Sequence, residues 1–84
     1  MHKVPLYYFD VNDGREGSVD TSGLDCANLE AARKMAVREL AQIIRDEMPD
    51  GERESYVVTV RDAEGIPVYF AAATMLGEML VRRD

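Results

Sequence analysis

His2 and Cys26 carry the side chains of this chain that most often bind transition metals or act in nucleophilic catalysis, and each residue type occurs once. A structural zinc site takes four such ligands, so a lone histidine and a lone cysteine do not favour one. A nucleophile also needs a base within reach, and the sole histidine lies next to the N-terminus. We therefore expect no metal, no cofactor and no catalytic residue. We interpret Cys26 as a small loop residue, although a helix that begins after it would lower the pKa of its thiol.

The stretch from Asp10 to Gly14 resembles the start of a calcium-binding loop. Asp10 and Asn12 match the first two ligand positions of the frame D-x-[DN]-x-[DN]-G, but Gly14 stands where the third oxygen ligand is needed. Asn12, Asp13 and Gly14 also favour tight turns, because they tolerate positive φ or bond their own backbone. We therefore predict a hairpin turn here and not a calcium site.

Two pairs of neighbouring carboxylates are the remaining candidates for general acid and base catalysis: Asp46 with Glu47, and Glu52 with Glu54. The first pair comes at the predicted end of a helix and the second in a turn, where carboxylates are usually solvated. We interpret both pairs as surface groups. The protein is accordingly predicted not to be an enzyme.

The composition is that of one small, acidic, globular domain. Of the 84 residues, 46% are hydrophobic and 31% are charged. We predict a single domain over residues 1–84, with fraying at residues 1–3 and about 76–84. The single cysteine favours a reducing compartment, and the N-terminal residues lack the apolar core of a signal peptide. These observations predict a cytoplasmic location.

The formal net charge of −6 argues against a general affinity for nucleic acid or anionic membranes. No apolar run approaches the ~20 residues that a membrane span requires. A local basic edge is present on the predicted helix, formed by Arg33, Lys34, Arg38 and Arg45. Four such residues are also typical of any solvent-facing helix surface, so direct binding of nucleic acid is not the leading hypothesis.

The longest regular pattern predicts an amphipathic helix from Asn28 to Met48. Its apolar residues recur at helical spacing along one side: Leu29, Ala32, Ala36, Leu40 and Ile43. Asn28 is the best N-cap candidate and Asp25 the second, since either side chain can accept a free N–H of the first turn. Pro49 and the turn residues after it predict that the helix ends close to Glu47 or Met48.

Before the helix, Val4–Val11 is predicted to be a strand with Tyr7, Phe9 and Val11 facing the core. A short polar strand near Glu16–Asp20 should follow at the edge of a sheet. The segment Thr21–Ala27 shows no periodicity and is predicted to be a loop.

After the helix, Glu54–Arg61 is the clearest strand, and its Tyr56, Val58 and Val60 should face the helix. The four residues Asp62–Gly65 are the predicted hairpin connection. The return strand runs from Ile66 to about Thr74, with Val68, Phe70 and Ala72 assigned to the core side. The residues after Thr74 fit either one or two turns of helix or an extension of this strand.

These elements predict an α+β fold with the order β-β-α-β-β, in which the helix packs on one face of a small, mainly antiparallel four-stranded sheet. No other segment is long enough to cover the second face. That face should carry an unusually apolar set of residues: Leu6, Tyr8, Val57, Thr59, Tyr69, Ala71 and Ala73. We expect it, or an edge strand, to form a homodimer interface or to bind an unidentified protein partner. Alternatively, Tyr8 and Tyr69 form a cross-strand pair on a solvent-facing sheet, or Met75–Val81 folds over them.

Four motifs, in order, resemble a family of short bacterial proteins, the domain of unknown function 6894. They are Y-Y-F-D-V-x-D-G at Tyr7–Gly14, N-L-E-A-A-R-x-x-A at Asn28–Ala36, D-E-M-P-D-G at Asp46–Gly51 and V-x-V-R-D-x-x-G-x-P-V at Val58–Val68. The resemblance extends from Leu6 to about Ala73. It implies a small soluble bacterial protein with this order of strands and helix, and with no assigned activity, substrate or catalytic residues.

A weaker likeness, which covers only the first hairpin and the helix, is to the antitoxin partners of bacterial toxin–antitoxin pairs. Their small domains also lead from a hairpin through such a helix into a further strand. Because likeness of fold alone says little about function, this gives only the alternative hypothesis, a regulator that binds a toxin or nucleic acid. The leading hypothesis is a non-enzymatic module that associates with itself.

Overall fold

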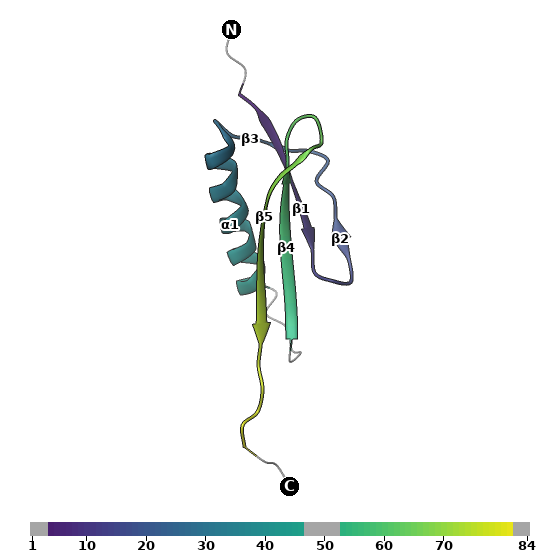
Figure 1. The fold of residues 1–84 in the computed structure, drawn as a ribbon, viewed down its shortest axis with the longest axis vertical. Helices are drawn as coiled ribbons and strands as arrows, with labels where there is room; N and C mark the ends of the chain where they lie inside the picture. Colours follow the sequence, from purple (N-terminus) through teal and green to yellow (C-terminus); the bar gives the residue numbers. More distant parts are fainter. Residues whose placement is uncertain (1–3, 47–52, 82–84) are drawn as a thin grey trace.

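The computed structural model describes residues 4–46 and 53–81, and for residues 53 and 54 the backbone only. Its elements are β1 (Leu6–Asn12), β2 (Gly17–Ser18), β3 (Leu24–Asp25), α1 (Leu29–Asp46), β4 (Arg53–Arg61) and β5 (Pro67–Leu76). The strands form one antiparallel sheet in the order β2-β1-β4-β5, with β3 also paired to β1. Helix α1 lies along one face of this sheet (Figure 1).

The expected α+β fold is confirmed, with five strands in place of the predicted four. The additional strand, β3, lies inside the predicted loop and pairs with the start of β1. Predictions for His2, for the helix end at Glu47 or Met48 and for the turn after Pro49 fall outside the described residues. Within the described part of the chain, no helix is long and apolar enough to cross a membrane.

Helix α1 begins where the sequence supplies an N-cap. Asn28 Oδ1 accepts the N–H of Ala31 at 2.8 Å, which satisfies one of the N–H groups that the first turn leaves free. The predicted cap is therefore confirmed. Most of the predicted apolar stripe is buried, whereas Leu29 at the start of the helix is half exposed. The buried members are Ala32, Ala36, Leu40 and Ile43.

The helix packs mainly over β4 and β5. Tyr56, Val58 and Val60 of β4 are buried, as their alternation predicted. The predicted core row of β1 is also confirmed, because its members pack against the same cluster while remaining partly exposed: Tyr7, Phe9 and Val11.

The predicted assignment of the two faces of β5 is wrong. Tyr69, Ala71 and Ala73 pack against the core on the helix side, where Tyr69 lies opposite Val60 of β4. Phe70, which was predicted to face the core, is exposed. A change of register by one residue turns every side chain of a strand to the other face.

A β-bulge in the β4–β5 hairpin causes this difference. A three-residue loop closes the hairpin, with the N–H of Asp62 donating to the carbonyl of Ile66 at 2.9 Å. This loop alone would place Val68 opposite Val60 and keep the predicted faces. A β-bulge follows, in which Pro67 and Val68 together lie opposite a single residue of β4. The bulge shifts the rest of β5 by one residue.

Candidate functional site

The sheet face opposite α1, called the open face from here on, is the surface for which the fold provides no second layer. Its residues alternate along β1, β4 and β5 with those that pack on the helix, and they include Leu6, Tyr8, Asp10, Val57, Thr59, Arg61, Phe70, Ala72, Thr74 and Leu76. Beyond Leu76, residues 77–81 are irregular and exposed, and they run away from the sheet (Figure 1). They therefore leave the open face uncovered. The alternative in which Met75–Val81 folds over Tyr8 and Tyr69 is wrong.

Four of the predicted interface residues lie on the open face and two do not. Leu6, Tyr8, Val57 and Thr59 are partly buried there. Tyr69 and Ala71 are on the helix side, so their assignment to the uncovered face is wrong. The predicted cross-strand pair of Tyr8 with Tyr69 is excluded for the same reason, because the two side chains lie on opposite faces of the sheet.

An ion pair occupies the β1–β4 part of the open face. Arg61 Nε donates to Asp10 Oδ2 at 2.7 Å, and Nη2 donates to Asp10 Oδ1 at 3.1 Å. The guanidinium carbon also lies 4.9 Å from the centre of the Tyr8 ring, a cation–π distance. Both charged side chains are about one-quarter exposed. The ion pair and the Tyr8 ring hold the Arg61 guanidinium over the β1–β4 part of the open face.

Between β2 and β3, where no strand pairs with this edge of β1, the side chain of Asp20 accepts a backbone hydrogen bond from β1. Its Oδ2 accepts the N–H of Phe9 at 3.1 Å, and its Oδ1 accepts those of Ser22 and Gly23 at 2.9 and 3.0 Å. The Asp20 carbonyl also accepts Arg61 Nη2 at 2.9 Å. A side-chain carboxylate thus replaces the backbone carbonyl that a continuous strand would offer to β1.

The loop that carries Asp20 also covers part of the open face. Gly23 has a φ of 76°, and a Cβ atom there would lie 2.9 Å from Leu6 Cγ and 3.0 Å from Tyr8 Cε1. Only a residue without a side chain fits so closely over β1 in this conformation. The β1 side of the open face is therefore sheltered by the protein's own loop.

The β5 side of the open face has no such shelter. Phe70 is 67% exposed and Leu76 is 72% exposed, and both belong to the outward row of β5. The sequence-based prediction missed these two residues, because the bulge that turns them outward leaves no signal in the alternation of the strand. Among the strand residues of the open face, the exposed large apolar side chains thus lie on β5.

Asp13 and Cys26, two of the residues that suggested metal or thiol chemistry, have structural roles. Asp13 Oδ1 accepts the N–H groups of Arg15 and Glu16 at 2.8 and 2.7 Å, which confirms the predicted turn. Cys26 is buried, and burial raises the pKa of its thiol, with the charge of Asp25 adding to the effect. Within residues 4–46 and 53–81, no group of three histidine, cysteine or acidic side chains is placed to hold a metal ion.

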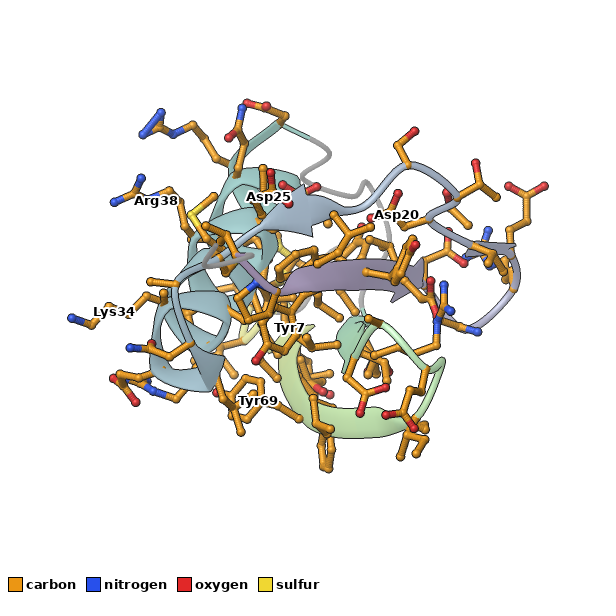
Figure 2. All side chains as sticks on the ribbon, turned by 90° about the horizontal axis from the view of Figure 1, so that it is seen from above. Tyr7, Asp20, Asp25, Lys34, Arg38 and Tyr69 are labelled. Atoms are coloured by element: carbon orange, nitrogen blue, oxygen red, sulfur yellow. The ribbon has the colours of Figure 1, made fainter. Side chains whose placement is uncertain are left out.

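One member of the predicted basic edge of α1, Arg33, forms an ion pair with Glu30. Arg33 donates to the carboxylate of Glu30 through Nε at 3.0 Å, and this contact, with the Tyr69 hydroxyl nearby, raises the pKa of the guanidinium. Lys34 and Arg38 point away from the sheet, on the opposite side of the molecule from Asp20 (Figure 2). The positive charges of Lys34 and Arg38 therefore lie far from Asp20 and its loop.

Comparison with protein families gives a match over residues 6–74 to the domain of unknown function DUF6894. The chain belongs to this family. The resemblance read from its four motifs is thereby confirmed. No curated protein and no solved structure matches the chain. The self-association and antitoxin-like hypotheses both stay predictions.

Asp10 and Asp20 should make the stability of this DUF6894 domain depend on pH in acid. The hydrogen bond from Arg61 lowers the pKa of the Asp10 carboxyl, and the N–H of Gly23 is the largest of several effects that lower the pKa of Asp20. A carboxyl with a lowered folded-state pKa contributes its full stabilisation above its ordinary pKa of 3.8, and this stabilisation is lost as the pH falls from that value through the lowered pKa. We expect the free energy of unfolding to stay level from about pH 7 to about pH 5 and to fall below about pH 4.

Urea denaturation followed by circular dichroism at a series of pH values measures this dependence. The Asp10→Asn variant should lose less stability below about pH 4, because one titrating group is gone. A decline in the wild type that is complete above about pH 5 would contradict the assignment to these carboxylates.

Proposed function

We propose that this member of the DUF6894 family is a non-enzymatic interaction module, which associates with a second copy of itself through the β5 side of the open face, in the cytoplasm of a bacterium. The observation that carries the proposal is the exposure of Phe70 and Leu76 on a face that neither α1 nor residues 77–81 cover. An apolar side chain gains about 1.5–3 kcal/mol when it is fully buried. A two-fold symmetric contact contains Phe70 and Leu76 from both copies, so it buries four such side chains.

Size and charge support the same proposal. A domain of 84 residues buries a modest core, so additional burial by association contributes a large share of its stability. β5 itself carries no charged residue, whereas the ion pair of Asp10 and Arg61 lies on the β1–β4 part of the open face. Two copies that meet at β5 therefore keep these ion pairs apart.

The test is to place a charge on the proposed contact and to measure the mass in solution. We expect the wild type to be a dimer by sedimentation equilibrium and Phe70→Glu to be a monomer, because a carboxylate would be desolvated in the contact. Val19→Glu is the matched control, since Val19 is 69% exposed but directly follows β2, the strand at the other edge of the sheet. It should remain a dimer. A monomeric wild type, or a Phe70→Glu variant that still dimerises, would refute the proposal.

A further inference from the structure

The two edges of the sheet differ in how well they are protected from pairing with another chain. The edge beside β1 is occupied by β2 and β3, which have two residues each and are separated by the loop of Asp20. The Asp20 carboxylate takes the N–H of Phe9 in the gap. Short strands, interruptions and charged side chains are the features by which proteins prevent edge-to-edge association.

The other edge, β5, carries almost none of these features. It is ten residues long, contains no charged residue, and among the described residues pairs with β4 alone. Its proline and its bulge, at Pro67 and Val68, both lie at the hairpin end. From Tyr69 to Leu76 the strand presents an uninterrupted, uncharged edge in a chain of net charge −6. Such an edge is where two copies can approach without electrostatic repulsion.

We infer that two copies pair edge to edge, with β5 antiparallel to β5 of the second copy and the two-fold axis at Ala72. This inference rests on the proposed self-association and specifies its geometry. The two sheets then become one continuous antiparallel sheet, with both helices on the same side. Backbone hydrogen bonds hold the contact, and the outward side chains of β5 determine its register.

Symmetry and the sequence of β5 together select this register. A two-fold axis perpendicular to the sheet keeps every side chain on its own face of the sheet. The axis must therefore lie midway between one residue and the same residue of the second copy, which are directly opposite each other. An axis at Ala72 pairs residues 68–76 with residues 76–68 of the second copy. Val68 then lies opposite Leu76 of the second copy, and Phe70 lies diagonal to it, within reach of its side chain.

The neighbouring registers give a ladder that is shorter or that includes a proline. An axis at Ala71 would bring Pro67, which has no N–H to donate, into the ladder and would leave Leu76 without a partner. An axis at Ala73 would shorten the paired stretch and leave Val68 outside it. The register at Ala72 therefore gives the longest ladder that includes all the exposed apolar side chains of the outward row.

The position of α1 fits the same arrangement. Because the helix packs over β4 and β5, its axis lies about one strand spacing from the interface, and the two helices come about 10 Å apart. This equals the usual distance between packed helices, which is about 8–10 Å. The two helices would therefore be in contact across the two-fold axis.

The helix presents an apolar row at that contact. Arg33 lies near Tyr69 of β5, and Val37 and Ile44 follow it on the same side of the helix, at i+4 and i+11. From Tyr69 to Ala72 the strand rises about 10 Å, which corresponds to about seven helical residues beyond Arg33. The axis thus passes near residue 40 of the helix, and Val37 comes opposite Ile44 of the second copy. Val37 is 43% exposed in the single chain, and this contact would bury it.

Cysteine cross-linking tests the register directly. Residues 71–73 are three consecutive alanines, which allows Ala71→Cys, Ala72→Cys and Ala73→Cys to be compared as matched variants. The only native cysteine, Cys26, is buried and has a raised thiol pKa, so each variant has one reactive thiol. On mild oxidation, Ala72→Cys alone should form a disulfide-linked dimer. Ala71→Cys and Ala73→Cys should cross-link only when the two are mixed and allowed to exchange, because these positions lie opposite each other on the helix side.

The outcomes separate the inference from the proposed function. Cross-linking of Ala71→Cys alone or Ala73→Cys alone would overturn the register at Ala72. A dimer in which the mixture of Ala71→Cys and Ala73→Cys fails to cross-link would overturn edge pairing, while leaving self-association through the open face intact. A wild type that sediments as a monomer would overturn both. Hydrogen exchange gives a second readout. The backbone amides of β5 that point away from β4 should be protected in the wild type and should exchange rapidly in Phe70→Glu.

Discussion

Replacing Leu40 by alanine should lower the free energy of unfolding by about 2–5 kcal/mol. Leu40 is 7% exposed and lies in the middle of the buried stripe of α1, in the same cluster as Val58 and Val60 of β4. The substitution removes buried apolar atoms and leaves a cavity that a sheet and a single helix can close only in part. Urea denaturation at a fixed protein concentration, followed by circular dichroism, measures the change.

The matched control is Leu29→Ala, the same chemical change on the same helix. Leu29 is 44% exposed, so we expect a loss of less than about 1 kcal/mol. For a domain of this size the whole stability is on the order of 4–13 kcal/mol, so the loss at Leu40 would be a large fraction of it. Protein concentration must be equal in both measurements, because the proposed dimerisation would stabilise the folded state. Equal losses at the two positions would mean that the helix buries a different side.

The elements that sequence patterns predicted correctly are those whose side chains follow one unbroken period. The stripe of α1 from Ala32 to Ile43 keeps helical spacing, and the row from Tyr56 to Val60 keeps the alternation of a strand. The helix cap and the turn were also predicted correctly, because the side chains of Asn28 and Asp13 accept hydrogen bonds from backbone N–H groups within three residues of themselves. For such features the interaction partner is close in the sequence.

The faces of β5 could not be derived in this way, because the bulge that sets its register leaves no signal in the alternation of the strand. Alternation shows which residues share a face, but it does not show which of the two faces packs on the helix. On β5 both rows are apolar, since Phe70 and Ala72 alternate with Tyr69 and Ala71. The register with β4, set by the bulge at Val68, decides between them. The error moved two residues, Tyr69 and Ala71, into the predicted interface and left Phe70 out of it.

The cluster of Asp10, Asp20 and Arg61 was also beyond sequence reasoning. Arg61 is separated from Asp10 by 51 positions and from Asp20 by 41 positions, and neither spacing is a recognisable motif. The sequence pattern places Asp20 at the end of a short polar strand. In the structure it interrupts that strand, and its carboxylate takes over a hydrogen bond of the sheet. Only the folded arrangement of β1 and β4 brings these charges together.

Replacing Asp20 by alanine should therefore cost on the order of 2–3 kcal/mol, since the N–H groups of Phe9, Ser22 and Gly23 lose an acceptor that carries a charge. Asp20→Asn should cost less, because its single amide oxygen can still accept the hydrogen bonds from the turn but not the one from Phe9. Asp25→Ala is the control: it removes the same charge from an exposed side chain in the same segment and should change stability by no more than about 0.5 kcal/mol.

Urea denaturation measures the cost of Asp20→Ala, and hydrogen exchange at the amide of Phe9 locates it. Loss of the carboxylate should accelerate exchange at Phe9, whereas the amides of β4 should exchange only as fast as the lower overall stability requires. Because Asp20 lies at the edge of the sheet opposite β5, the proposed dimer should persist in every variant that remains folded. If Asp20→Ala is as stable as Asp25→Ala, the carboxylate does not hold the interrupted edge, and β2 and β3 must be held to β1 by their backbone pairs alone.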